Sequence, residues 1–454
     1  MINWELRKME GYTFSNWAGT KSCTPELYFE PTTVDEIKQI IDKARQEGKR
    51  IKVRGYGHSP NDIACGDEYM IYLKNMEAVI NVDEVQCQVT VQAGCSLKTL
   101  AVDILPKYKM ALPVCPAVGE PTIAGAISSG THATGKHYGN LGSYVRSLKL
   151  LTANSDIIDC SEEENEEIFR AAVCSIGCLG IILEITLQCH EAFQLHSIAK
   201  PSTFEEILTR LDTFLEEYDH AKFFWYPHTE KVVVYHDIRT KHQPVKNNFS
   251  WFWDRLIGHH LHEFSMWIGC LFPRVQPFVN QMMFRLLCDS TVERVDAMYN
   301  LFTYYCLYSQ DVTEWAIPLE KTADVLRELK SKMSLNPEIA AHFPLEVRFA
   351  KADEGLISPC HKRDSCFINI VHFRPYGINS SNDSYWNLFQ DIVKKAGGRP
   401  HWAKDHGVTG KDFCKMYPEW GKFCAIREKL DPSGMFLNKH LERIFDINHS
   451  KKDN

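Results

Sequence analysis

The sequence predicts an α+β protein of two domains, and three observations lead to this prediction. The chain has 454 residues, and at about 150 residues per domain this is enough for two or three domains. Hydrophobic residues make up 44% and charged residues 24% of it, the balance of a globular protein rather than a disordered one. Helix and strand patterns alternate up to about residue 190, and their character changes beyond that point.

Helix and strand signals in the first part indicate a nucleotide-type α+β domain. Thr32 and Thr33 are N-cap candidates for a helix that Gly48 ends. The loops do not match the G-x-G-x-x-G pattern of a Rossmann unit. Apolar positions at helical spacing are Ile37, Ile40, Ile41 and Ala44; strands are expected at 50–54, 88–93, 148–152 and 180–187, and Ser96 is expected to cap a short helix.

Beyond about residue 190 the pattern predicts a second domain with its own sheet. Helical segments at Phe204–Tyr218 and Lys321–Lys332 alternate with strands at Ala221–Tyr226, Lys231–Tyr235 and Leu345–Ala350. No internal repeat is present in the sequence.

Charge and cysteine content exclude some classes of function. The 51 Lys and Arg against 58 Asp and Glu give a formal charge of −7, and with no long basic run a nucleic-acid surface is not expected. Residues 1–7 lack the apolar stretch of a secretory signal. The 16 cysteines are therefore expected to be reduced core residues of a cytosol-facing protein. None forms a C-x-x-C pair, so we expect no metal site.

The loop Arg54-Gly-Tyr-Gly-His-Ser-Pro60 is the strongest local signal of a ligand site. It follows a strand, and Gly55 and Gly57 would let the backbone approach a ligand and turn its N–H groups toward a phosphate. His58 would then place an imidazole beside this cradle. On spacing alone, a hairpin turn with a solvent-facing histidine is an equally good interpretation.

Three further motifs combine residue types that contact ligands. The small residues of Ser129–Gly135 suit a flat or phosphorylated ligand, although such clusters are usually plain loops. In Leu345–Phe349, alternation puts Glu346 and Arg348 on one face, where they could hold a polyol or form an ordinary surface ion pair. The stretch Gly397–His406 contains a tryptophan, a lysine and two histidines, and its lysine could offset negative charge on a cofactor.

Together, V-R-G-x-G-H-S-P, S-G-T-H-x-T-G, E-V-R-F and G-G-R-P-H-W-A-K-x-H resemble the aldonolactone oxidases of the vanillyl-alcohol-oxidase flavoprotein superfamily. Four motifs in the same order make the resemblance specific, and similar stretches extend it from about Asn16 to Phe445. It implies a two-domain vanillyl-alcohol-oxidase type fold. Residues 1–190 would form an FAD-binding domain, residues 191–395 a cap domain with an antiparallel sheet, and residues 396–454 a C-terminal segment that completes the flavin site.

The same resemblance implies that the cofactor is FAD. Its pyrophosphate would lie in the Arg54–Pro60 loop, and its 8α-methyl group would be bonded covalently to His58, which would prevent its loss. The expected cofactor-binding residues are Arg54, Gly55, Tyr56, Gly57, His58, Ser59, Pro60, Ser129, Gly130, His132, Thr134, Gly135, Ile182 and His406.

The resemblance further implies oxidation of the C2 hydroxyl of an aldonolactone such as L-gulono-1,4-lactone. The hydroxyl becomes a ketone, oxygen becomes hydrogen peroxide, and the keto-lactone rearranges to L-ascorbate. Glu346 and Arg348 match the family's substrate-binding pair, and Lys404 matches a lysine near flavin N1, where negative charge grows on reduction. His372, on the strand Cys366–Phe373, could accept the hydroxyl proton, although the family tends to have an apolar residue there.

The choice of electron acceptor depends on one position in the resemblance. Counting back from Ile123 without gaps, the family position that governs oxygen access falls on Pro116. Alanine there is typical of the dehydrogenases, whereas glycine or proline favours an oxidase. The alternatives are a dehydrogenase, an oxidase of another aldonolactone or alditol such as L-galactono-1,4-lactone, and a membrane-associated binding protein without turnover, which the presence of the expected site residues disfavours.

The segment Trp251–Cys288 is unusually rich in aromatic residues. Its longest uncharged runs, Phe264–Phe272 and Val275–Phe284, are shorter than the roughly 20 residues that span a bilayer. It is therefore either a pair of buried helices or an interfacial membrane patch. Because the resemblance implies a microsomal protein, we expect peripheral or integral association with the endoplasmic reticulum membrane through residues 251–288.

Overall fold

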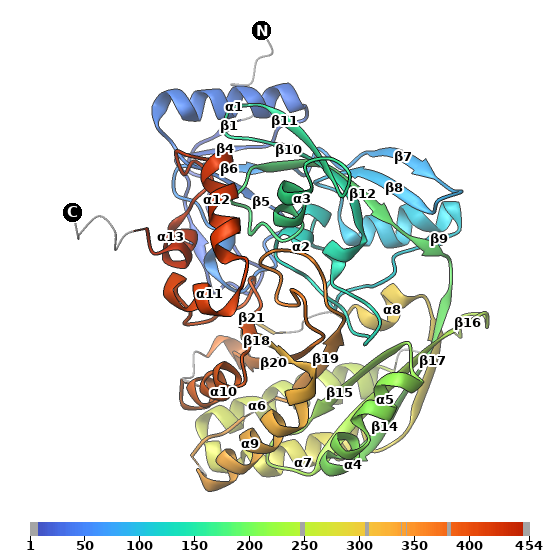
Figure 1. Cartoon of the computed structure of the whole chain (residues 1–454). Coiled ribbons are helices and arrows are strands. Elements are labelled where there is room, and N and C mark those ends of the chain that lie inside the picture. Colours follow the sequence, from blue (N-terminus) through green and yellow to red (C-terminus); the bar gives the residue numbers. More distant parts are fainter. Residues whose placement is uncertain are drawn as a thin grey trace.

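The computed structural model describes residues 8–245, 250–304, 308–336, 338–341, 343–378 and 383–447. Two sheets form the N-terminal domain, one large sheet forms the cap domain, and the last helices return to the N-terminal domain (Figure 1).

The first sheet of the N-terminal domain is mixed. Its order is β1 (Lys8–Met9), β4 (Leu27–Phe29), β6 (Tyr69–Tyr72) and β5 (Ile51–Arg54), with β4 and β5 both parallel to β6. Helix α1 (Val34–Glu47) buries its isoleucines in the same core. The Thr33 hydroxyl accepts a hydrogen bond from the Glu36 N–H at 3.2 Å, and Gly48 ends the helix at φ 64°. Both predicted ends of this helix are confirmed.

The second sheet of the N-terminal domain is antiparallel. Its order is β11 (Ile157–Ser161), β10 (Val145–Leu151), β12 (Ile181–Gln188), β8 (Gln88–Gln92) and β7 (Val79–Asp83). Helices α2 (Ile123–Ser128) and α3 (Glu166–Ala172) lie in the same part of the chain as these strands. Two short antiparallel strand pairs complete the domain: β2 (Phe14–Ser15) with β3 (Ser22–Cys23), and β9 (Met110–Ala111) with β13 (His190–Glu191).

The cap domain contains the predicted antiparallel sheet. Its order is β17 (Val292–Asp296), β14 (Gln194–Thr203), β16 (Lys231–Thr240), β15 (His220–Trp225), β19 (Leu345–Ala350), β20 (Ser365–Phe373), β18 (Gln310–Pro318) and β21 (Arg399–Pro400). One face joins the main core with α4 (Phe204–Thr209), α5 (Leu211–Glu217), α9 (Thr322–Leu335) and α10 (Asp383–Lys395). The helix expected at 204–218 is thus two helices, separated at Arg210. The short α8 (Met298–Phe302) lies beside β14 and β17.

The aromatic segment forms a π-helical stretch at Trp251–Leu261, followed by α6 (His262–Leu271) and α7 (Gln276–Leu287). Met266, Met283 and Phe284 are buried, whereas most of the other large apolar side chains are exposed. The helices expected to be buried are therefore buried on one side only. Over the residues that the structure describes, none of the helices has both the length and the apolar character needed to cross a bilayer.

The C-terminal residues contribute to both domains. Strand β21 extends the cap sheet, whereas α11 (Gly410–Met416), α12 (Trp420–Leu430) and α13 (Lys439–Phe445) lie against the N-terminal domain (Figure 1). The Ile51 N–H donates to the Met435 carbonyl at 2.7 Å, and the Asn438 amide donates to the Ile63 carbonyl at 3.0 Å. The cysteines within the described residues are free thiols.

Candidate active site

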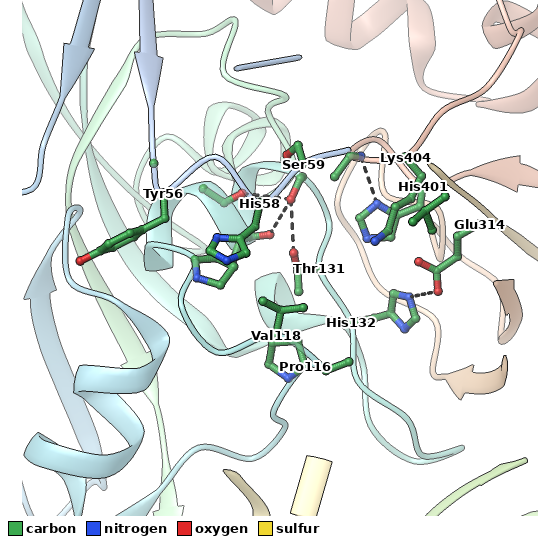
Figure 2. Close-up of a pocket in the computed structure, with 18 of the residues that line it drawn as sticks. Tyr56, His58, Ser59, Pro116, Val118, Thr131, His132, Glu314, His401 and Lys404 are labelled. Carbon is green, nitrogen blue, oxygen red and sulfur yellow. Dashed lines mark hydrogen bonds and ion pairs between the residues drawn. The ribbon is translucent and has the colours of Figure 1, made fainter. Parts of the chain in front are cut away.

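A cavity of about 660 Å³ lies between the two domains (Figure 2). Its N-terminal wall consists of loops and helix ends: Arg54–Ser59, 116–118, 121–132 and 176–182 contribute most of it. Its sheet wall consists of alternate residues on neighbouring strands: Lys222 and Phe224 on β15, Glu346 and Arg348 on β19, Asn369 and Val371 on β20, and Gln310, Val312 and Glu314 on β18. His401 and Lys404, which follow β21, close one end.

The glycine-rich loop of the N-terminal wall has no room for side chains at its two glycines. A Cβ at Gly55 would lie 2.7 Å from the Thr122 hydroxyl, and one at Gly57 would lie 2.9 Å from the Phe14 ring. Gly57 also has φ +80°, a conformation that glycine adopts readily. Backbone atoms of this loop therefore reach the cavity directly.

Arg54 and Pro60 hold the two ends of this loop. The Arg54 guanidinium donates to the hydroxyls of Tyr12 and Tyr28 at 2.9 and 2.8 Å and lies 3.8 Å from the Tyr72 ring centroid. The Asn16 amide donates to the Pro60 carbonyl at 3.0 Å, and Pro60 does not line the cavity. Tyr56 lines the rim of the cavity, but its ring is exposed and points away from the other labelled residues (Figure 2).

His58 lies inside the cavity wall rather than in solvent. Its Nδ1 atom is buried without a hydrogen-bond partner, and its Nε2 atom lies 3.9 Å from a Glu120 carboxylate oxygen. The Trp17 ring stacks on the imidazole with a centroid distance of 6.2 Å. Burial lowers the pKa of His58. Burial therefore favours the neutral imidazole, and none of the residues that the structure describes hydrogen-bonds its Nδ1 atom.

Some residues of the predicted loop Ser129–Gly135 line the cavity, and others lie at the interface between the domains. Ser129 and His132 line the cavity, as does Ile182 from β12, whereas Gly130, Thr134 and Gly135 do not. The Thr134 hydroxyl donates to the Ala221 carbonyl and accepts from the Phe349 N–H at 3.2 Å. The Gly135 N–H donates to the Phe349 carbonyl at 2.8 Å. Thr134 and Gly135 therefore join the loop to strands β15 and β19 of the cap sheet.

Glu346 and Arg348 are not a surface ion pair. Both side chains are buried in the sheet wall, with Arg348 Nε 3.5 Å from Glu346 Oε2. The Tyr304 hydroxyl donates to Glu346 at 3.0 Å, and the Asn369 amide donates to it at 3.4 Å. Two hydrogen-bond donors and the adjacent guanidinium thus fix the position of one carboxylate at the cavity surface.

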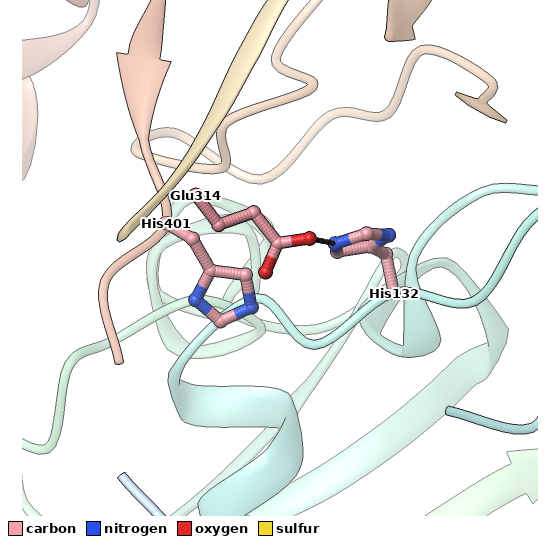
Figure 3. Close-up of side chains that lie close together, drawn as sticks. All are labelled: His132, Glu314 and His401. Atoms are coloured by element: carbon pink, nitrogen blue, oxygen red, sulfur yellow. Dashed lines mark hydrogen bonds and ion pairs between the residues drawn. The ribbon is translucent and has the colours of Figure 1, made fainter. Parts of the chain in front are cut away.

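A second buried carboxylate, Glu314, connects the sheet wall to the N-terminal wall (Figure 3). It pairs with the Arg348 guanidinium, and its Oε1 lies 3.1 Å from His132 Nε2. Burial alone would raise the pKa of Glu314, but Arg348 and His132 hold it well below its ordinary value. The His132 ring stacks on Phe367 at 3.5 Å. Glu314, His132 and His401 could ligate a metal by distance, but the Arg348 guanidinium already balances the carboxylate.

The segment that carries His401 and Lys404 is fixed by backbone and amide hydrogen bonds. The His401 N–H donates to the Glu314 carbonyl at 2.9 Å, and the Lys404 N–H donates to the His401 carbonyl at 3.0 Å. From the glycine-rich side, the Asn61 amide donates to the carbonyls of Trp402 and Lys404 at 2.8 and 3.0 Å. This arrangement places Lys404 at the junction of the two walls (Figure 2).

Two further predicted site residues, His372 and His406, do not line the cavity. On β20, Asn369, Val371 and Phe373 line it, so strand alternation directs His372 to the opposite face, where it pairs in register with Asp311. The structure therefore does not support the assignment of His372 as the proton acceptor. His406 is also absent from the lining: its Nδ1 accepts from the Val408 N–H at 3.3 Å, and its ring packs near Trp402 and Phe413.

Several cavity residues were not assigned from the sequence. His401 lies inside the motif Gly397–His406 but has no role assigned from the sequence, whereas Glu314, Lys222, Tyr304 and Asn369 were not singled out. The signal for Lys222 was available, because the strand Ala221–Tyr226 alternates apolar core residues with Lys222 and Phe224. Pro116, assigned to oxygen access, does line the cavity, and its carbonyl accepts from the Thr303 hydroxyl at 3.4 Å.

Comparisons with known proteins agree with this geometry. Residues 185–444 match the D-arabinono-1,4-lactone oxidase family, and residues 25–161 match the FAD binding domain family. An L-gulonolactone oxidase of Bos taurus is 48% identical over 96% of this chain and 99% of its own length. One of Scyliorhinus torazame is 45% identical over 96% and 98%. An L-gulono-1,4-lactone dehydrogenase of Mycobacterium tuberculosis is 32% identical over 95% and 98%.

Among solved structures, a solvent-stable cholesterol oxidase superposes with a TM-score of 0.79 over 98% of this chain and 99% of its own. At 16% identity this likeness shows the fold alone, and it confirms the expected vanillyl-alcohol-oxidase type architecture. The chain therefore belongs to the D-arabinono-1,4-lactone oxidase family, the aldonolactone oxidases, and its N-terminal part is an FAD-binding domain.

Proposed function

We propose that this chain is an FAD-dependent oxidase that converts the C2 hydroxyl of L-gulono-1,4-lactone to a ketone and releases hydrogen peroxide. The observation that carries the proposal is the buried Glu346–Arg348 pair on the sheet wall, which faces a glycine-rich wall across one cavity. Its location in a member of this family supports a polyhydroxylated lactone as the substrate.

The N-terminal wall fits a flavin nucleotide. Side chains are absent at Gly55 and Gly57, and a Cβ at Gly94 would lie 1.9 Å from the Leu73 carbonyl oxygen. These positions bring main-chain groups to the cavity, as a phosphate and a flat ring require. When bound, FAD supplies the hydride acceptor and transfers the electrons to oxygen.

The sheet wall binds and orients the lactone in this proposal. The Glu346 carboxylate, already held by Tyr304 and Asn369, accepts a hydrogen bond from the C2 hydroxyl. Arg348 donates to the neighbouring lactone carbonyl, and Glu314 keeps its guanidinium in place. Lys404 lies where the two walls meet and offsets negative charge that develops on the cofactor.

We test this function by measuring hydrogen peroxide release when the purified protein meets L-gulono-1,4-lactone in air. Peroxide equal to the lactone consumed is expected, and Glu346→Gln and Lys404→Met should each slow turnover by about 10²-fold or more. Reduction of an artificial dye without peroxide would instead identify a dehydrogenase, and the role assigned to Pro116 would be withdrawn. Oxidation of L-galactono-1,4-lactone in preference would change only the substrate.

We also propose that His58 carries the flavin covalently. The support is its buried, unoccupied Nδ1 and its lowered pKa, which keeps the imidazole nucleophilic. Denatured wild-type protein should retain the flavin absorbance, and His58→Ala should lose it. His137→Ala, at an exposed histidine, is the matched control. Release of all flavin from the denatured wild type would contradict the bond and leave the oxidase proposal standing.

Finally, we propose that the aromatic segment attaches the protein to the endoplasmic reticulum membrane surface. Its exposed side chains include Trp251, Trp253, Phe272 and Phe278. Three arginines, Arg255, Arg274 and Arg285, are exposed in the same segment. Apolar rings with nearby cations suit an interface of acyl chains and anionic headgroups.

This attachment is checked by flotation with vesicles that contain anionic phospholipid. The wild type should float with the vesicles, and a variant that combines Trp251→Ser, Trp253→Ser, Phe272→Ser and Phe278→Ser should remain in the soluble fraction while keeping its flavin. If both proteins stay soluble, the segment has another role.

A further inference from the structure

Lys222 is a cation of the sheet wall that the proposed chemistry does not use. It projects from β15 into the cavity, and its side chain is almost completely buried. No hydrogen bond or ion pair joins its ammonium to any residue that the structure describes. A buried charge without partners is costly unless something else satisfies it.

Four aromatic rings surround the Lys222 ammonium. The centroid distances from Nζ are 5.2 Å to Tyr235, 5.3 Å to Phe302, 5.6 Å to Tyr304 and 5.9 Å to Phe224. Ring faces stabilise the charge, but they do not replace oxygen acceptors for its three N–H groups. Burial lowers the pKa of Lys222, and the nearby Glu346 carboxylate acts against this shift. The ammonium therefore lies at the cavity surface, where a ligand can accept its hydrogen bonds.

The strand order places Lys222 on one particular side of the substrate pair. Strand β15 neighbours β19, which carries Glu346 and Arg348, while β20, β18 and β21 follow on the other side. Phe223 pairs in register with Val347, so Lys222 lies close to the level of Arg348. Neighbouring strands are about 4.8 Å apart. Lys222 is therefore on the side of Glu346 and Arg348 away from Glu314, His401 and Lys404.

We propose that Lys222 is a specificity-determining residue that donates hydrogen bonds to the exocyclic hydroxyl oxygens of the bound aldonolactone. The inference rests on the proposed function, in which Lys404 offsets charge on the cofactor, so that the carbon to be oxidised faces the Lys404 end of the cavity. The exocyclic diol is the part of the lactone remote from that carbon, and it offers neutral oxygens to the ammonium. Glu346 and Arg348 then bind the lactone ring, and Lys222 binds the exocyclic hydroxyl groups attached to it.

The experiment compares two lactones with Lys222→Met. One is L-gulono-1,4-lactone; the other is the four-carbon aldono-1,4-lactone with the same ring configuration but no exocyclic diol. We expect Lys222→Met to raise KM for the six-carbon lactone roughly 10- to 100-fold, the effect of losing hydrogen bonds to a charged group. Its kcat and the KM for the four-carbon lactone should change less than about threefold. Lys222→Arg should recover part of the loss.

A matched control lies on the neighbouring strand. Lys231 of β16 also places its ammonium over an aromatic ring, 5.3 Å from Phe284, but it does not line the cavity. Lys231→Met should leave both KM values unchanged. Binding without turnover is measured with the 2-deoxy analogue of the six-carbon lactone, through the change in flavin absorbance that it causes, and Lys222→Met should weaken this binding by the same factor.

The outcomes separate the two proposals. If the wild type oxidises neither lactone, the proposed function fails. If it oxidises them and Lys222→Met raises both KM values equally, lowers only kcat, or changes nothing, the assignment of Lys222 is overturned while the function stands. One further result would overturn the assignment of Lys222. In it, Lys222→Met loses flavin or has a lowered unfolding midpoint, and Lys222→Arg shows no preference between the two lactones.

Discussion

The two walls of the cavity recognise ligands by different means. The N-terminal wall brings main-chain groups close by omitting side chains, as at Gly55 and Gly57. The sheet wall instead presents ionisable side chains, among them Glu346, Arg348 and Lys222, on strands whose opposite face is core. A main-chain wall is sensitive to added volume, whereas a charged wall is sensitive to the loss of one partner.

This difference predicts which substitutions disrupt each wall. The charged wall is a connected network in which Glu314 balances the charge of Arg348 and contacts His132. Removal of one member therefore leaves the other buried groups without a partner. The main-chain wall contains no such network at its glycines, and its weakness is steric. Substitutions of charged residues and of glycines therefore test the two walls separately.

The largest expected effect comes from Glu314→Ala. It leaves the buried Arg348 guanidinium without its main counter-charge, a change that costs about 3–5 kcal/mol in comparable buried pairs. We expect a lower unfolding midpoint in urea and a fall in kcat/KM for the lactone, because Arg348 loses its fixed orientation. Glu314→Gln, which keeps the shape, should lose less stability than Glu314→Ala.

The control for Glu314 is an ion pair outside the cavity. Glu205 and Arg327 pair at 2.8 Å, with both side chains largely exposed. Surface pairs contribute little, so Glu205→Ala should leave the unfolding midpoint and kcat/KM near the wild-type values. Equal losses in Glu314→Ala and Glu205→Ala would contradict the view that burial gives the network its importance.

The second effect, on the main-chain wall, comes from Gly57→Ala. The new Cβ would collide with Phe14, and φ +80° is strained for alanine, which together cost about 1–3 kcal/mol. Because the loop must shift, the flavin-to-protein ratio after purification should fall. Gly48→Ala is the matched control: it has φ +64° but open space around it and lies far from the cavity. Its flavin content should equal that of the wild type.

The same difference explains which parts of the site could be predicted from the sequence. Glycines in the Arg54–Pro60 loop signal a main-chain ligand site locally, because their conformational role requires no distant partner. Alternation likewise identified Glu346 and Arg348 as residues of one strand face. What the sequence could not supply was the surroundings: the same two residues fit a surface ion pair until Tyr304 and Asn369 are brought to them across the fold.

The misplacement of His372 and His406 and the omission of Lys222 have the same physical cause. In the strand 365–373, large apolar residues occupy both faces, so nothing in the pattern shows that His372 lies opposite the cavity. His406 follows Lys404 by two residues, but the chain turns inward between them, toward Trp402 and Phe413. Lysine in a strand usually marks the solvent side, and only the placement of the N-terminal domain over that face turns Lys222 into a cavity residue.

The smallest expected effect concerns pH and tests whether the buried histidines of the charged cluster are neutral. Burial lowers the pKa of His401 well below its ordinary value, and its Nδ1 accepts a hydrogen bond from the Ala403 N–H at 3.1 Å. In the unfolded chain, where the histidine pKa is near 6.5, His401 therefore binds a proton that it does not bind in the folded chain. The free energy of unfolding must then fall as the pH decreases below about 6.5, by up to about 1.4 kcal/mol per pH unit for this one group.

His401→Asn isolates that contribution, because the asparagine oxygen can still accept from the Ala403 N–H. Urea unfolding between pH 7.5 and 5.5 should show a smaller loss of stability in His401→Asn than in the wild type, by about 1.4 kcal/mol in total over these two pH units. His137→Asn, at an exposed ring, should keep the wild-type slope. An unchanged slope in His401→Asn would mean that His401 is protonated in the folded chain, so that the cluster around Glu314 would hold two cationic partners instead of one.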